Sequence, residues 1–286
     1  MATVARPGRE ISMVAKNTKS RFEGWSYKAY DFQKKYDVIH HLNKYGFVIV
    51  EGDWEYTDHD FFKLAKLYNL GESYKSEFNM AEHREGVSKS GINQIGGLAT
   101  GDHIVFNSNS EIPLHTDGSY LPIGSIQTTV LLCKQPALVG GETILFDSKT
   151  AFLKLKQDHS DLAELLTHQD IFRRRSTTTK SGKLYEYIGP AFHMDRISGV
   201  QTCFTLDVTA DWDHSYNISP KAKDAVGYLM DLATNTSKFY LEFSLQKGHA
   251  IIFRNDQLSH GRLAFKQSDN YPRTLFRGLF ENCPSI

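Results

Sequence analysis

The stretch PLHTDGSY, residues 113–120, opens the part of the chain in which strand signals dominate. The segments that follow it are short, rich in β-branched and aromatic residues, and bounded by Gly, Pro, Asp or Ser. They are SIQTTVLLCK (125–134), ETILFD (142–147), DIFRRRS (170–176), KLYEYIG (183–189), GVQTCFTLDV (199–208), KFYLEFSL (238–245), GHAIIF (248–253) and RTLFRGLFE (273–281). Many strands with a few flanking helices favour a mainly β protein, with a double-sheet barrel or jelly roll, over alternating βαβ units.

Composition excludes several classes of function. The 286 residues are 40% hydrophobic, and Lys plus Arg equals Asp plus Glu at 33 each, so no net charge favours nucleic acid or an anionic membrane surface. No apolar run approaches the ~20 residues of a membrane span. The three cysteines lack CxxC spacing, which argues against a disulfide framework and a thiolate zinc site. We expect a cytoplasmic protein.

The chain divides into an arm and one domain. Residues 1–25 show no sustained period and are expected to form a loose N-terminal arm, followed by a single jelly-roll domain over 26–286. A helix is predicted to stop at Gly46, and a second is announced by Thr57 with Asp60 three residues on. Residues 79–111 are rich in glycine and poor in apolar runs, which predicts a lid over a site.

His115 and Asp117 are candidate metal ligands. Residues i and i+2 of a strand point to the same face, so the two side chains converge while Thr116 points away. A lone HxD is also explained by a buried histidine followed by a turn-capping aspartate. His260, which follows the apolar strand GHAIIF in NDQLSHGRLAF, makes the metal reading stronger. Two histidines and one carboxylate form the facial triad of non-haem Fe(II) enzymes.

Two arginines are candidate anion ligands. Arg273 and Arg277 lie on one face of PRTLFRGLF, and an inward guanidinium in an apolar strand needs an anionic partner. Two anionic groups are one explanation, and ion pairs with a nearby acid such as Glu281 or Asp269 are the other.

The order of PLHTDGSY, GGETILFD, SHGRLAF and PRTLFRGLF resembles the taurine dioxygenase, clavaminate synthase and γ-butyrobetaine hydroxylase group of Fe(II)/2-oxoglutarate-dependent oxygenases, over roughly residues 46–280. The resemblance implies a double-stranded β-helix (jelly-roll, cupin-like) core. It implies that His115, Asp117 and His260 ligate Fe(II), and that Thr143 and Arg273 hold the 5-carboxylate of 2-oxoglutarate, with dioxygen as the oxidant. It also implies that Arg277 holds a carboxylate or sulfonate of the substrate, as in several members, and that Arg262 braces a loop.

The expected reaction is oxidation of an unactivated C–H bond, with hydroxylation first and desaturation or cyclisation as related outcomes. The expected substrate is a small carboxylate-bearing molecule, an amino acid or related metabolite, as in natural product biosynthesis. Glu111, just ahead of the HxD strand, and Asp213 are further candidate substrate contacts.

Other readings stay open. The basic stretch FRRRSTTTKSGK (172–183) could dock an acidic carrier protein or a phosphorylated substrate. A protein that binds metal and a small acid without turnover is the alternative of another class. A homo-oligomer is also compatible with the sequence.

Overall fold

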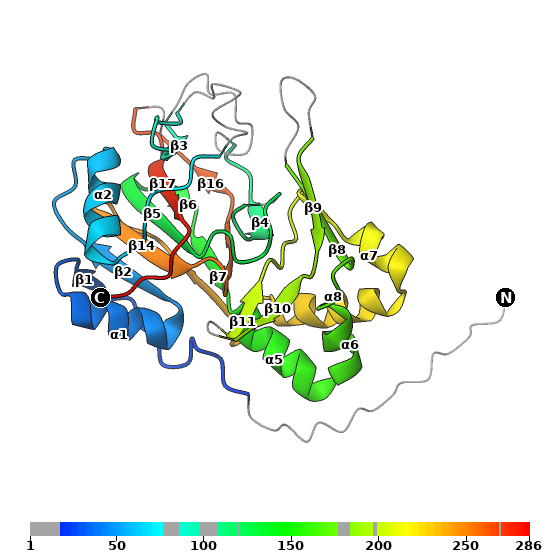
Figure 1. Cartoon of the computed structure of the whole chain (residues 1–286). Coiled ribbons are helices and arrows are strands. Elements are labelled where there is room, and N and C mark those ends of the chain that lie inside the picture. Colours follow the sequence, from blue (N-terminus) through cyan, green and yellow to red (C-terminus); the bar gives the residue numbers. More distant parts are fainter. Residues whose placement is uncertain are drawn as a thin grey trace.

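Two β-sheets packed face to face form the centre of the molecule (Figure 1). The computed structural model describes residues 18–76, 86–97, 108–118, 120–176, 184–196, 199–268 and 270–286. The larger sheet has the strand order β1 (Ala29–Asp31), β2 (Phe47–Glu51), β14 (His249–Arg254), β5 (Thr128–Gln135), β17 (Thr274–Phe280) and β3 (Asn93–Gly96). The smaller sheet has the order β13 (Tyr240–Phe243), β7 (Thr143–Phe146), β15 (Ser259–Arg262) and β4 (Ile112–His115).

Neighbours in these sheets are mostly far apart in the sequence and antiparallel, as in a jelly roll. The predicted mainly β fold with a double-stranded β-helix core is confirmed. The remaining strands form small sheets at the periphery. They are β6 (Val139–Gly140) with β16 (Phe265–Lys266), β10 (Phe192–Asp195) with β11 (Gly199–Thr202), and β8 (Phe172–Arg175) between β12 (Ala210–Asp211) and β9 (Glu186–Gly189).

Apolar side chains from the two sheets close one end of the space between them. Leu131 and Leu275 of the larger sheet share a buried cluster with Leu145 and Phe243 of the smaller sheet. Polar side chains, among them His115, Asp117 and His260, line the pocket beside this cluster. The space between the sheets therefore holds an apolar cluster and, next to it, a pocket that contains the candidate functional side chains.

Helices cover the outer faces of both sheets (Figure 1). α1 (Lys35–Tyr45) and α2 (Asp58–Leu67) pack on the larger sheet. Gly46 ends α1 in the left-handed conformation, at φ 81°, and Thr57 and Asp60 form the capping box of α2, as the sequence predicts. A segment between β7 and β13 covers the smaller sheet with a second set of helices: α5 (Ser148–Asp158), α6 (Ser160–Leu165), α7 (Trp212–Ile218) and α8 (Lys221–Leu232).

The predicted arm and lid are described only in part. Residues 1–17, 79–85 and 98–107 lie outside the described ranges. From the arm, Phe22 is buried in the core, and Arg21 Nε donates a 2.9 Å hydrogen bond to Asp147 at the start of α5. From the lid segment, residues 93–96 form β3, the edge strand beside β17.

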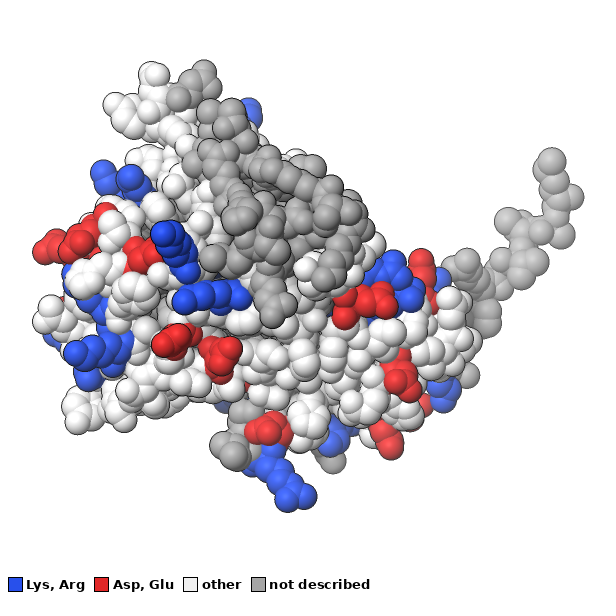
Figure 2. Space-filling model, turned by 45° about the horizontal axis from the view of Figure 1, so that its top comes forward, with Lys and Arg blue, Asp and Glu red and all other residues white. Residues whose placement is uncertain are grey.

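Charges of both signs are mixed over the described part of the face shown in Figure 2, in keeping with the equal numbers of basic and acidic residues. No helix in the described ranges has both the length and the apolar composition required to cross a membrane.

Candidate active site

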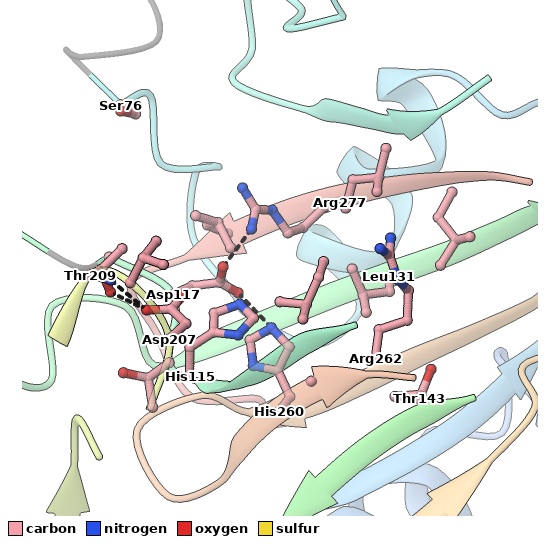
Figure 3. Close-up of a pocket in the computed structure, with 18 of the residues that line it drawn as sticks. Ser76, His115, Asp117, Leu131, Thr143, Asp207, Thr209, His260, Arg262 and Arg277 are labelled. Carbon is pink, nitrogen blue, oxygen red and sulfur yellow. Dashed lines mark hydrogen bonds and ion pairs between the residues drawn. The ribbon is translucent and has the colours of Figure 1, made fainter. Parts of the chain in front are cut away.

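The three predicted metal ligands converge at the open end of the smaller sheet (Figure 3). His115 ends β4 and lies directly opposite His260 of β15 in the antiparallel ladder, with ring centroids 4.2 Å apart. Asp117 follows His115 by two residues, and its Oδ2 lies 3.6 Å from His260 Nε2. One donor atom from each residue lies within 4.8 Å of the others. Two imidazoles and one carboxylate on one side of a common point match the donor set of a facial triad.

Hydrogen bonds orient two of these ligands. His115 Nδ1 lies 3.0 Å from the Pro113 carbonyl oxygen, which fixes Nδ1 as the donor and Nε2 as the atom available to a metal. Asp117 Oδ2 accepts a 2.8 Å hydrogen bond from the Thr129 hydroxyl, and the Asp117 backbone N–H donates to Asn255 Oδ1 at 2.8 Å. These bonds hold both ligands in place. His115 Nε2 takes no part in them, whereas Asp117 Oδ2 both accepts from Thr129 and lies next to His260.

The electrostatics keep Asp117 and His260 in their metal-binding protonation states. Burial would raise the pKa of Asp117, but Arg277, followed by His260 and His115, outweighs burial and lowers that pKa to about 2. Burial and the neighbouring His115 lower the pKa of His260 to about 3. The carboxylate is therefore ionised and His260 is neutral at pH 7, as metal coordination requires.

Arg277 contacts the triad directly. Its NH1 donates to Asp117 Oδ1 at 2.6 Å, and its NH2 donates to Asn93 Oδ1 at 3.1 Å (Figure 3). The acid that Arg277 meets among the described residues is thus a candidate metal ligand 160 residues earlier in the chain, while Asp269 lies outside the described residues.

Arg273, Thr143 and Arg262 line the same pocket at its other end. Arg273 is 6% exposed, and among the described residues none forms an ion pair with it. Thr143 is buried on β7, directly opposite Arg262 on β15. Burial lowers the pKa of Arg273 to about 10, and burial together with Arg273 lowers the pKa of Arg262 to about 9. This end of the pocket is buried and cationic.

Two predicted substrate contacts lie elsewhere. Glu111 is exposed and does not line the pocket. Asp213 borders a second, shallower pocket beside Asp211 and Thr209. In the basic stretch, Arg173 and Arg175 pair with Asp211, and residues 177–183 lie outside the described ranges.

Asp207 is a pocket residue that the sequence analysis did not single out. Its Oδ1 accepts hydrogen bonds from the Thr209 backbone N–H at 2.9 Å and the Thr209 hydroxyl at 2.6 Å, and its side chain lines the pocket (Figure 3). Its D-x-T turn is a common local signal, so nothing in the sequence marks it as functional. The pocket mouth also carries hydroxyl groups, from Tyr74, Ser76, Tyr120, Ser176 and Thr209.

Comparisons with known proteins agree with this geometry. The model of the taurine catabolism dioxygenase TauD, TfdA family matches residues 13–279. A uridine-5'-phosphate dioxygenase from Amycolatopsis sp is 32% identical over 86% of this chain and 89% of its own length. A uridine-5'-phosphate dioxygenase from Streptomyces sp is 29% identical over 89% of this chain and 92% of its own length.

A solved structure with a similar fold is that of AAD-2 in complex with Mn(II) and N-oxalylglycine. It has a TM-score of 0.65 at 16% identity and covers 91% of this chain and 94% of that chain. The chain therefore belongs to the taurine catabolism dioxygenase TauD, TfdA family, and is an Fe(II)- and 2-oxoglutarate-dependent dioxygenase with a double-stranded β-helix fold.

Proposed function

We propose that this enzyme oxidises a C–H bond of a nucleoside 5'-monophosphate, with uridine 5'-monophosphate (UMP) as the first candidate. The observation that carries the enzymatic part is the His115, Asp117 and His260 triad at one pocket with a cationic far end. The substrate class is supported by the two relatives, which are named for uridine-5'-phosphate. The sequence alone favoured an amino acid or related metabolite, with a phosphorylated substrate as the alternative, and we now prefer the phosphorylated substrate.

In this proposal His115 Nε2, His260 Nε2 and an Asp117 carboxylate oxygen hold Fe(II). With 2-oxoglutarate and dioxygen, the bound metal supplies the oxidising chemistry, in which 2-oxoglutarate becomes succinate and carbon dioxide and the substrate is oxidised. The protein keeps Asp117 ionised and His260 neutral, orients His115 and Asp117 through Pro113 and Thr129, and excludes water with the apolar walls between the sheets.

Thr143 and Arg273 would hold the 5-carboxylate of 2-oxoglutarate. Arg273 is a buried cation that has no ion-pair partner among the described residues, and an anionic ligand offsets its desolvation. Thr143, Arg273 and the triad line one cavity, as binding of a single ligand with an anionic group at each end requires.

Substrate recognition falls to the pocket mouth in this proposal. Arg277 places a positive charge beside the triad, where it would attract the phosphate. Asp207, fixed by Thr209, would accept hydrogen bonds from the ribose hydroxyls or the uracil N–H. Tyr120, whose ring lies 5.4 Å from that of Tyr185, offers an aromatic face for the base.

An acidic carrier protein is a weaker alternative. Arg173 and Arg175 of the basic stretch already contact Asp211, and Arg175 also contacts Glu186.

We place the enzyme in the cytoplasm, in keeping with its three free cysteines. The oligomeric state is tested by light scattering, which measures the molar mass of the purified protein in solution.

The test is substrate-dependent turnover. Fe(II)-loaded enzyme is supplied with 2-oxoglutarate and oxygen, and succinate and oxygen consumption are measured with UMP, uridine, 2'-deoxy-UMP, cytidine 5'-monophosphate and a panel of amino acids. We expect UMP to give coupled succinate formation and uridine to give none. Stimulation by an amino acid and not by any nucleotide would contradict the substrate class while leaving the enzyme class intact.

A further inference from the structure

Arg262 is a buried guanidinium with hydrogen-bond partners on one side only. Its NH2 donates to the carbonyl oxygens of Ser108 and Ser110, at 2.7 and 2.6 Å. Its Nε and NH1 are buried and have no partner among the described residues. The residue is 5% exposed and lines the pocket. Buried charged donors without acceptors are strongly unfavourable, so we expect a ligand with acceptor oxygens to bind next to these two nitrogens.

The surroundings of Arg262 indicate where that ligand lies. Thr143 is its direct cross-strand neighbour, so their side chains share one face of the smaller sheet. Figure 3 shows Arg262 and Thr143 on neighbouring strands, to the right of the triad. The ligand position is therefore the part of the pocket beside Thr143.

Arg262 also lies close to a second cation. The guanidinium carbon atoms of Arg262 and Arg273 lie 4.7 and 5.2 Å from the centroid of the same Phe265 ring. Two buried positive charges repel each other, and neither forms an ion pair with a described acid. An anion bound in the pocket that both side chains line reduces the repulsion and offsets the desolvation of both groups.

We propose that Arg262 is a second cationic ligand of the distal carboxylate of 2-oxoglutarate, acting with Arg273 and Thr143. One of the two free nitrogens donates to the carboxylate, while NH2 keeps its bonds to Ser108 and Ser110. This assignment rests on the proposed cosubstrate site. It goes beyond the role of a loop brace, because one guanidinium joins the cosubstrate to the backbone that leads into β4, which carries His115.

The geometry requires arginine at this position. The planar guanidinium presents donors in two directions, toward the loop carbonyls and toward the pocket. A lysine ammonium on a flexible stem supplies charge to one side at a time. Arg262→Lys is therefore expected to lie between wild type and Arg262→Gln in its affinity for the cosubstrate.

The experiment compares two 2-oxo acids that differ at the distal end. 2-Oxoglutarate has the distal carboxylate, and 2-oxobutyrate lacks it while keeping the group that binds the metal. Binding of each is titrated anaerobically to full-length Fe(II)-loaded protein by visible absorption, for wild type, Arg262→Gln, Arg262→Lys and the control Arg173→Gln. Arg173 is an arginine that pairs with Asp211 away from the pocket. Turnover is not part of the readout.

We expect Arg262→Gln to weaken 2-oxoglutarate binding by about 10- to 100-fold and to change 2-oxobutyrate binding by less than about 2-fold. The control should leave both unchanged. Equal weakening of the two ligands would mean that Arg262 only braces the loop, and unchanged 2-oxoglutarate affinity would also overturn the assignment. Should Arg262→Gln fail to fold, the same ratio measured on Arg262→Lys decides, with an expected loss of about 3- to 10-fold for 2-oxoglutarate alone.

The two levels of the proposal fail differently. If the wild-type enzyme binds 2-oxoglutarate no better than 2-oxobutyrate, the cosubstrate site itself is wrong. If the wild type discriminates between them and Arg262→Gln discriminates equally well, only the role of Arg262 is wrong.

Discussion

Two groups of arginines in this molecule differ in what surrounds them. Arg173 and Arg175 of β8 stand in the conspicuous run FRRRS, and both contact Asp211, with Arg173 NH2 at 2.5 Å from Asp211 Oδ2. Arg262 and Arg273 stand apart in the sequence, are 5% and 6% exposed, and form no ion pair with a described acid. In the sequence, the run that contains Arg173 and Arg175 resembles an anion-binding site. In the structure, we assign anion binding to Arg262 and Arg273 instead.

An anion-binding site is therefore indicated by a buried arginine that lacks an acidic partner, and not by a high density of positive charge in the sequence. A partly exposed ion pair contributes about 0–1 kcal/mol, and water can replace either partner. A buried guanidinium without an acid has no such replacement, so its desolvation is offset only when a ligand arrives. The following predictions test this contrast.

The largest effect is expected for Arg273→Gln. Loss of a buried charge partner costs about 2–4 kcal/mol, which corresponds to about 30- to 1000-fold weaker binding of 2-oxoglutarate. Anaerobic titration of the Fe(II)-loaded protein measures this affinity, and Arg175→Gln is the matched control. An equal loss in the control would break the distinction between the two groups.

A second effect is expected at Arg277, which belongs to neither group because its partner is a candidate metal ligand. Arg277→Gln should raise KM for UMP by about 10-fold, the value of one charge-assisted hydrogen bond of about 1.5 kcal/mol, and change 2-oxoglutarate affinity by less than about 3-fold. Steady-state kinetics with each substrate varied in turn separates the two. A defect confined to 2-oxoglutarate would place Arg277 with Arg273.

Two acidic residues can be compared in the same way, Asp207 in the main pocket and Asp213 in the second pocket. One oxygen of Asp207 accepts hydrogen bonds from Thr209, and its side chain lines the main pocket. Asp207→Asn keeps an oxygen for Thr209 and puts a donor in place of an acceptor. We expect kcat/KM for UMP to fall about 5- to 30-fold, as for one lost hydrogen bond to a charged group. Asp213→Asn, at the shallower pocket, is the control, and an equal decrease there would remove Asp207 as a substrate contact.

The smallest effect is expected for Arg173→Gln. Its pair with Asp211 is partly exposed, so the free energy of unfolding should fall by about 0.5–1 kcal/mol, measured by urea denaturation. Binding of 2-oxoglutarate and UMP should not change. A loss of UMP binding would show that the basic stretch belongs to the site after all.

The sequence predicted the parts of the site that depend on local pattern. The i, i+2 spacing of His115 and Asp117 and the short strands follow from the period of a β-strand. His260 was predicted from its place after an apolar strand, and the resemblance to known oxygenases agreed with that prediction. The strand class, the jelly roll and the enzyme class are confirmed.

Other parts depend on contacts between distant residues. The pairing of Arg277 with Asp117 joins residues 160 positions apart, and the free nitrogens of Arg262 are visible only once its neighbours are placed. Glu111 was singled out only because it lies just ahead of the HxD strand, and the sequence does not show which way it faces. A register shift between His260 and Arg262 places Ile112 opposite Arg262 and His115 opposite His260, so the alternation breaks and Ile112 lines the pocket while Glu111 is exposed.

One measurement tests the central claim most directly: an anaerobic visible titration of the Fe(II)-loaded wild-type enzyme with 2-oxoglutarate, followed by UMP and, separately, by uridine. The account predicts a weak absorption band when 2-oxoglutarate binds the metal, and a shift of that band with UMP but not with uridine. Folded, iron-loaded protein that gives no band with 2-oxoglutarate would contradict the proposed roles of the triad and of Arg273.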